Sequence, residues 1–326
     1  MNDYQPRNFA LPVDYCFAGE PANAVDPYLF SREAVIAVDV ALATERPLLV
    51  SGPPGCGKSR LAETMAALLQ WSFVYKTITS RTRFEQLTVE VDHLRRLNDA
   101  HRAAATERNT RLGRDEEYYI PGIFWWAFNP LSAGRRGFPH RAPPPRSTPR
   151  FPGVPRQPAP GWPAGTVLLI DEIDKAEPDL PNDLLEPLDR GSFDLPDGRT
   201  LVADPQMKRL TIITTNRERE LPQAFLRRCV YLRLAAPEKP ALLAIAAVRA
   251  PEAAADLVGH VADRIVAIRE DFKESGRRAP GTSEFIDAVN TCQKLGIAVG
   301  SSEWQQVERA TLSKPMALED EHPRRA

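Results

Sequence analysis

Nine consecutive residues limit what this chain can fold into more than any other segment. Residues 51–59 read Ser-Gly-Pro-Pro-Gly-Cys-Gly-Lys-Ser, directly after an apolar run at 48–50 and directly before a segment with helical periodicity. In such a loop between a strand and a helix, backbone N–H groups surround phosphates, the lysine reaches the β- and γ-phosphates, and the last hydroxyl can bind Mg²⁺. The sequence therefore predicts a nucleoside triphosphate site at Gly52, Pro53, Pro54, Gly55, Cys56, Gly57, Lys58, Ser59 and Arg60.

The overall composition narrows the class of protein. The 326 residues are enough for more than one domain, and a formal net charge of −1 argues against a general attraction to nucleic acid or to an anionic membrane. The first residues lack the layout of a signal peptide, and no apolar run approaches the roughly 18 residues needed to cross a bilayer. We therefore expect a cytoplasmic protein with neither a membrane nor a nucleic-acid partner. The four cysteines are widely spaced, so we expect free thiols rather than disulfides or a zinc site.

Apolar runs and helical periodicity alternate in the first two thirds of the chain. Helical spacing predicts helices at 29–43, with Ser31 as the N-cap, and at 60–69. Strands alternating with helices predict a three-layer α/β fold of the P-loop NTPase type, with a parallel five-stranded sheet. The phosphate loop would lie at the carboxyl end of the first strand, where such sheets bind ligands. The strands are expected at 48–50, 71–78, 166–170 and 210–214, with a fifth, weaker one at 229–234, and the continuously apolar ones are expected to be buried on both faces.

The chain changes character after Pro237, where only helical patterns remain. Amphipathic spacing predicts lid helices at 253–275, 283–295 and 302–312. We expect four parts: an N-terminal arm at 1–27, an α/β nucleotide-binding core at 28–236, a small all-helical lid domain at 237–316 and a charged tail at 317–326.

An insertion in the core differs from the rest of the chain. Residues 134–165 contain ten prolines and six arginines and no acidic residue. Proline at this density disfavours both helix and sheet, so we expect a flexible basic loop. It can be a docking arm for an acidic partner, nucleic acid or an aromatic groove, or an insertion tolerated on the surface. The second interpretation is favoured.

An acidic pair follows the third predicted strand. Asp171 at the strand end can hold Mg²⁺, and Glu172 can polarise a water for attack on the γ-phosphate. Acidic residues also end strands for solubility alone, so the pair gains its meaning from the upstream phosphate loop. Asp174 and Lys175 are interpreted as solvated charges at a helix start.

Two further features complete the candidate site. Asn216 ends the fourth predicted strand and would lie between the phosphate loop and the acidic pair, where it can orient water and sense the γ-phosphate. Alone, it would be an ordinary turn asparagine. Arg227 and Arg228 precede the last strand and can act as an arginine finger at a neighbouring subunit's nucleotide, or make ordinary surface ion pairs.

These motifs, in this order and followed by a helical domain, resemble the AAA+ ATPases. Finer features resemble the MoxR-like branch of that family over roughly residues 28–295. They are the segment 79–97, the Pro-Gly-Ile-Phe-Trp-Trp-Ala-Phe string at 121–128, the extended acidic motif at 171–185, and a hairpin expected around Asp197 and Gly198.

The resemblance implies an activity and partners. MoxR-like proteins hydrolyse ATP with Mg²⁺, usually as hexameric rings, to remodel or activate a protein client, and often act with a partner that contains a von Willebrand factor A domain. It implies that Lys58, Ser59, Asp171, Glu172 and Asn216 of one subunit bind ATP and Mg²⁺. Arg228, with Arg227 beside it, would reach in from the next subunit. The client is not fixed by the fold.

One position departs from the family pattern. The family usually has a second sensor arginine in a Gly-x-Ser-x-Arg pattern, whereas here Gly281-Thr-Ser-Glu-Phe285 places phenylalanine there. Arg277 or Arg278 can substitute, or can belong to a plain basic loop. Trp125 and Trp126 can line a central pore, although packing is favoured.

Two alternative functions stay open. One is a nucleotide-dependent switch or scaffold in a bacterial signalling or defence system, which the altered second sensor favours and the intact Glu172 disfavours. The other is a GTP-driven DNA-restriction motor, for which the sequence offers no guanine-specificity motif. The paired arginines and Asn216 argue against a small-molecule P-loop kinase.

Overall fold

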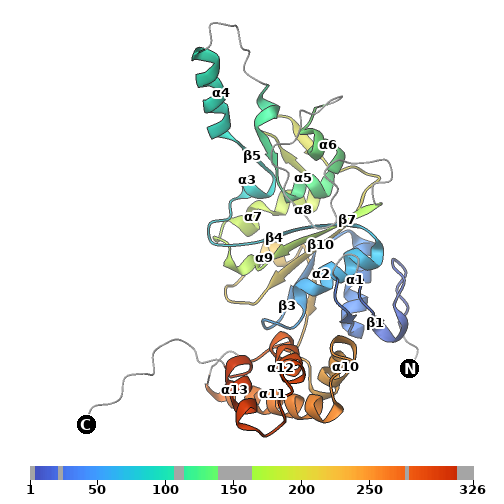
Figure 1. The fold of residues 1–326 in the computed structure, drawn as a ribbon. Helices are drawn as coiled ribbons and strands as arrows, with labels where there is room; N and C mark the ends of the chain where they lie inside the picture. Colours follow the sequence, from blue (N-terminus) through green and yellow to red (C-terminus); the bar gives the residue numbers. More distant parts are fainter. Residues whose placement is uncertain (1–3, 21–24, 106–113, 139–163, 276–278, 314–326) are drawn as a thin grey trace. The chain divides into compact units, whose positions relative to one another are not determined.

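The computed structural model describes residues 4–20, 25–105, 114–138, 164–275 and 279–313. Its internal contacts divide the chain into two compact units (Figure 1). The first contains Met1–Leu11, Arg32–Ser51 and Leu61–Leu232, and the second contains Pro12–Ser31, Gly52–Arg60 and Arg233–Ala326. This division follows packing and is not the predicted division into domains, which stays a prediction.

A parallel five-stranded sheet organises the first unit. The strands are β3 (Leu48–Ser51), β4 (Ser72–Thr77), β7 (Gly165–Asp171), β10 (Lys208–Thr215) and β11 (Val230–Arg233). Their order across the sheet is β11-β3-β10-β7-β4. All five predicted strands are confirmed, with ends that differ by one or two residues. Strands such as β7 are buried on both faces, which explains why their sequences are continuously apolar.

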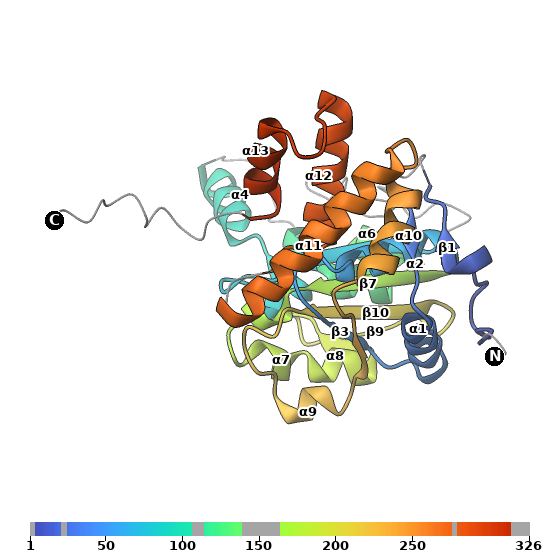
Figure 2. The same ribbon diagram turned by 90° about the horizontal axis from the view of Figure 1, so that it is seen from below.

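Helices lie on both sides of the sheet, with α2 on one side and α8 and α9 on the other (Figure 2). These elements span Lys58–Leu69, Leu185–Arg190 and Gln223–Leu226. The three-layer α/β prediction is therefore confirmed. The other helices of this unit are α1 (Arg32–Thr44), α3 (Phe84–Leu87), α4 (His93–Ala105), α5 (Ile123–Phe128), α6 (Pro130–Arg135) and α7 (Leu180–Asp183).

The first predicted helix begins three residues later than expected. Residues Tyr28–Leu29 form strand β2, which pairs antiparallel with β1 (Cys16–Phe17), and α1 begins at Arg32. The apolar side chain of Leu29 fitted the helical spacing, but its backbone pairs with Cys16 instead. Ser31 still directly precedes the helix, where an N-cap residue belongs.

Helix α5 forms the centre of the main core. All six of its residues are buried, and Trp125 and Trp126 are 0% and 2% exposed. Trp125 packs edge-on against Phe193, with ring centroids 6.4 Å apart. The packing interpretation of the tryptophan pair is therefore confirmed, because neither side chain is available to a client.

Two small antiparallel strand pairs are separate from the five-stranded sheet. Strands β5 (Val89–Val91) and β6 (Tyr119–Pro121) form the first pair, with α4 in the connection between them, and β8 (Ser192–Asp194) and β9 (Thr200–Val202) form the second, a hairpin. The second is the hairpin predicted around Asp197 and Gly198. Gly198 has a φ of +81°, in the left-handed region that favours glycine in such turns.

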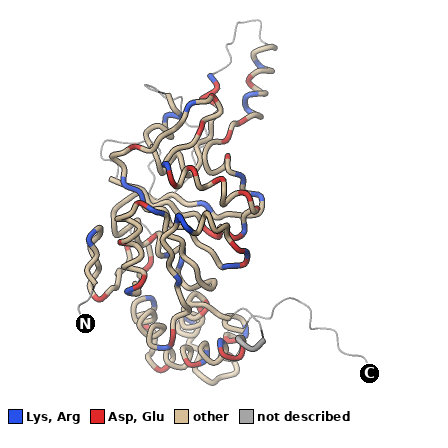
Figure 3. Tube along the Cα trace, turned by 180° about the vertical axis from the view of Figure 1, so that it is seen from behind, with Lys and Arg blue, Asp and Glu red and all other residues tan. Residues whose placement is uncertain are grey.

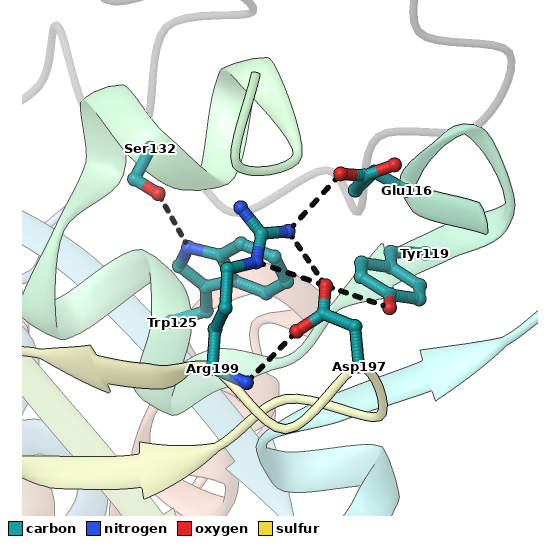
Figure 4. A network of polar contacts seen from close by, with 6 residues as sticks. All are labelled: Glu116, Tyr119, Trp125, Ser132, Asp197 and Arg199. Atoms are coloured by element: carbon teal, nitrogen blue, oxygen red, sulfur yellow. Dashed lines mark hydrogen bonds and ion pairs between the residues drawn. The ribbon is translucent and has the colours of Figure 1, made fainter. Parts of the chain in front are cut away.

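A polar network ties the β8–β9 turn to the segment before β6 (Figure 4). The Asp197 carboxylate accepts hydrogen bonds from Arg199 Nη2 at 2.6 Å and from the Tyr119 hydroxyl at 3.1 Å. Arg199 also contacts Glu116 at 3.3 Å. The Arg199 guanidinium lowers the pKa of Asp197 to about 2, although partial burial opposes this.

Helices α10 (Lys239–Arg249), α11 (Ala255–Ser275), α12 (Thr282–Leu295) and α13 (Ser302–Thr311) make up most of the second unit. The three predicted lid helices are confirmed, and α10 is an additional one. The core of this unit contains Val261, Ile265, Phe285 and Trp304, all buried. Positive and negative residues are interspersed along the traced chain (Figure 3). Residues 139–163 of the proline-rich insertion lie outside the described part of the chain.

Candidate nucleotide site

The phosphate loop follows β3 directly and ends where α2 begins at Lys58. Gly55 and Gly57 have φ angles of +76° and +93°. Residues with a Cβ adopt such angles only under strain. A Cβ on Gly57 would also lie 3.3 Å from the ring of Tyr28. The two glycines therefore have a physical reason to be glycine in this turn.

The loop holds its own lysine in place. Lys58 Nζ donates to the carbonyl oxygens of Gly52 and Pro53, both at 2.9 Å, and its side chain is largely buried. Arg60, two residues further along α2, pairs with Asp26 at 2.8 Å, and Asp26 also contacts Arg249 at 3.0 Å. The ammonium thus lies inside a compact loop, where an anion can replace the carbonyl partners.

Cys56 occupies the tip of this loop. Burial raises the pKa of its thiol, and the nearby Lys58 opposes that rise without cancelling it. The thiol therefore stays protonated at neutral pH, so Cys56 is a packing residue of the loop rather than a nucleophile.

The start of helix α12 lies against the phosphate loop within the second unit. Thr282 N donates to Gly55 O at 3.1 Å, and Gly281 N donates to Glu284 Oε2 at 3.0 Å. Phe285, at the expected place of the second sensor arginine, is fully buried in the core of the second unit. It therefore cannot take the role of a sensor. Arg277 and Arg278, the suggested substitutes, lie outside the described residues.

The acidic pair and Asn216 lie together at the carboxyl ends of β7 and β10. Asn216 Nδ2 donates to Glu172 Oε1 at 3.2 Å, and Glu172 has a φ of +59°. Strand β10 lies between β3 and β7, and Ser51 at the end of β3 pairs with Thr215. The strand order therefore agrees with the predicted place of Asn216, between the strand that leads into the phosphate loop and the acidic strand.

The position of Asp174 contradicts the interpretation that it is a solvated charge. It was expected to be solvated, but it is 2% exposed, and its Oδ2 accepts from Asn216 N at 3.1 Å and Glu218 N at 2.9 Å. The interpretation failed because Asp174 lies in a 3₁₀ turn (Ile173–Lys175) that turns its side chain toward the loop after β10. Lys175 is partly exposed and pairs with Glu218.

The paired arginines are surface residues of the first unit. Arg228 is paired with Asp189 of α8, donates to Ala224 O at 3.0 Å, and has a side chain that is 42% exposed. The carbonyl oxygen of Arg227 accepts a hydrogen bond from the Arg46 side chain. Sequence reasoning did not identify Asp189 because only the fold brings α8 next to the residues before β11.

The donor types fit ATP and Mg²⁺. The predicted metal ligands, the Ser59 hydroxyl and the Asp171 carboxylate, are hard oxygen donors of the kind that Mg²⁺ prefers. Within the described residues, no group of three or more His, Cys, Asp or Glu side chains is arranged to hold a metal.

Comparison with known families adds to this geometry. The family model of the AAA domain, dynein-related subfamily, matches residues 47–229. That match extends from the strand before the phosphate loop to the residues after Arg228. The chain belongs to the AAA domain family. The phosphate loop, the acidic pair, Asn216 and the paired arginines of this AAA protein all lie inside the matched range.

No curated protein matches this AAA protein significantly. Among solved structures, NtrX from Brucella abortus in complex with ATP is 14% identical with a TM-score of 0.43, over 83% of this chain and 52% of NtrX. A Cytophaga hutchinsonii protein described as a candidate ATPase is 14% identical with a TM-score of 0.40, over 65% of this chain and 48% of its own. This chain thus spans about half the length of each.

In the described part of the chain, no helix of this AAA protein combines the length and apolar character that a membrane-spanning helix requires.

Proposed function

We propose that this AAA protein is a MoxR-like ATPase that works as a ring, expected to be a hexamer, and uses ATP hydrolysis to remodel or activate a protein client. The observation that carries the proposal is the hydrogen bond between Asn216 and Glu172 at the ends of adjacent strands. This pair holds a carboxylate and an amide side by side, as activation and orientation of a water molecule require.

In the proposed reaction, Glu172 accepts a proton from a water molecule as the water oxygen attacks the γ-phosphorus. The bond from the γ-phosphorus to the bridging oxygen breaks, and ADP leaves with that electron pair. Asn216 orients the water, and Lys58 stabilises the phosphate charge. Asp171 and Ser59 would hold Mg²⁺, which neutralises charge on the β- and γ-phosphates when bound.

The partly exposed side chain of Arg228 supports the ring in this proposal. Its side chain is half-exposed and borders α8, so a second molecule that packs there can receive it. Arginine suits this task because its planar guanidinium contacts two phosphate oxygens at once. We propose Arg228, with Arg227 beside it, as the residue that completes the nucleotide site of the next subunit.

The client and partner rest on the MoxR-like resemblance alone. We propose a protein client and a partner that contains a von Willebrand factor A domain, at a cytoplasmic location. A nucleotide-dependent switch is the second candidate, and the burial of Phe285 supports it because it removes one means of coupling the lid to the γ-phosphate.

The test is the rate of ATP hydrolysis per subunit as a function of protein concentration. A shared site predicts that the rate per subunit rises as the protein assembles, and that Arg228→Ala removes the rise. Arg102→Ala is the matched control, because Arg102 is an exposed arginine on α4 that forms an ion pair with Asp99 of the same helix. A rate that is independent of concentration and insensitive to Arg228→Ala would refute the ring and leave the switch.

A further inference from the structure

Thr214, which the sequence-based site does not include, contacts both members of the acidic pair. Its Oγ1 donates to Asp171 Oδ1 at 2.6 Å and accepts from Glu172 N at 2.9 Å. Thr214 is fully buried on β10, two residues before Asn216. One side chain therefore touches the proposed metal ligand and the backbone of the proposed base.

The two hydrogen bonds are mutually consistent. A hydroxyl has one proton, and donation of that proton to Asp171 leaves a lone pair for Glu172 N. A bond from a hydroxyl to a carboxylate is charge-assisted and therefore among the stronger hydrogen bonds in proteins. A hydrophobic residue of the same shape would fill the space without making either contact.

Glu172 needs this support because of its backbone. Its φ of +59° is in the left-handed region, where a residue with a Cβ is held only by its surroundings. The bond from Glu172 N to Thr214 fixes this conformation on the backbone side, and the bond to Asn216 fixes the carboxylate. Without the first bond, the carboxylate would sample other directions.

We propose that Thr214 is a positioning residue for ATP hydrolysis. It fixes the Asp171 carboxylate and the left-handed turn at Glu172 together, so that metal ligand and base keep one relative geometry. The inference rests on the proposed ATPase mechanism and adds to it a residue that touches neither the nucleotide nor the water.

The experiment compares Thr214→Val, Thr214→Ser and Thr166→Val. Valine keeps the shape and removes the hydroxyl, and serine keeps the hydroxyl. Thr166 is the matched control, because it is a fully buried threonine near the start of neighbouring β7 whose Oγ1 makes no hydrogen bond within the described residues. Steady-state hydrolysis gives kcat and KM, and a fluorescent ATP analogue reports binding with and without Mg²⁺.

We expect Thr214→Val to lower kcat roughly tenfold to a hundredfold with little change in KM for ATP. Thr214→Ser should recover most of the rate, and Thr166→Val should match the wild type. Equal rates in Thr214→Val and Thr166→Val, with an active wild type, overturn this inference alone. A wild type that does not hydrolyse ATP overturns the proposed function as well. Should Thr214→Val not fold, Thr214→Ala replaces it, because alanine removes the same hydroxyl without new bulk.

Discussion

Two polar networks of the first unit differ in the groups that donate hydrogen bonds to their carboxylates. At the ends of β7 and β10, Asp171 is positioned by a threonine hydroxyl and Asp174 by two backbone N–H groups. At the β8–β9 turn, Asp197 is instead paired with a guanidinium, that of Arg199. Neutral donors orient a carboxylate and leave its charge for a metal or a proton, whereas a guanidinium neutralises that charge. The first arrangement suits chemistry, and the second suits attachment of a hairpin.

The largest expected effect tests the first network. Glu172→Gln keeps the size of the side chain and the hydrogen-bonding oxygen but removes the base, so hydrolysis should fall by roughly 10²–10⁴-fold. ATP binding should persist, as measured by equilibrium titration with a fluorescent analogue. A variant that retains near-normal hydrolysis would show that Glu172 is not the base.

The second prediction concerns Asp174. Asp174→Ala removes two hydrogen bonds that the buried carboxylate accepts from the N–H groups of Asn216 and Glu218, which should lower the free energy of unfolding by about 2 kcal/mol. Hydrolysis should fall as well, because the Asn216 backbone loses its anchor. Asp174→Asn is the control, since its amide oxygen can still accept. Chemical denaturation and steady-state rates measure the two effects, and loss of stability with an unchanged kcat would separate Asp174 from catalysis.

The third prediction concerns the network at the β8–β9 turn, where a substitution should leave the rate of ATP hydrolysis unchanged. Asp197→Asn should lower the free energy of unfolding by about 1 kcal/mol. The pKa of Asp197 is lowered from its ordinary 3.8 to about 2, so its stabilisation is present above 3.8 and is lost as the pH falls through 2. Denaturation of wild type and variant from neutral pH downward should show the difference shrinking in that range. A difference that is constant with pH would exclude an ionic origin.

The smallest effect is expected at Tyr119. Tyr119→Phe removes one hydrogen bond to Asp197 and should cost about 0.5 kcal/mol of unfolding free energy. Burial, and then the bond to Asp197, raises the pKa of Tyr119 from its ordinary 10.0 to about 12. Its contribution is therefore present below pH 10 and is lost as the pH rises through 12. The tyrosinate absorbance of wild type minus variant should show this late titration, and a step near the ordinary value would contradict the hydrogen bond.

Much of the fold could be predicted from local patterns. Continuous apolar runs predicted central strands such as β7, because a strand buried on both faces needs no polar alternation, whereas the edge strands β4 and β11 are only partly buried. The phosphate loop could be recognised because its backbone geometry requires glycine at particular places, and Gly55 and Gly57 do have positive φ angles. The β2 strand was missed because Leu29 fits a helical stripe equally well, and only pairing with β1 decides between them.

By itself the sequence determined which residue types meet at the ends of the strands, because parallel strands place their carboxyl ends at one edge. Only the tertiary structure decided how those residues are held. The contacts of Thr214, Asp174 and Asn216 join residues more than forty positions apart. Such contacts depend on strand order and register, which no local spacing encodes. For the same reason Arg228 could be chosen from the sequence, whereas its partner Asp189 could not.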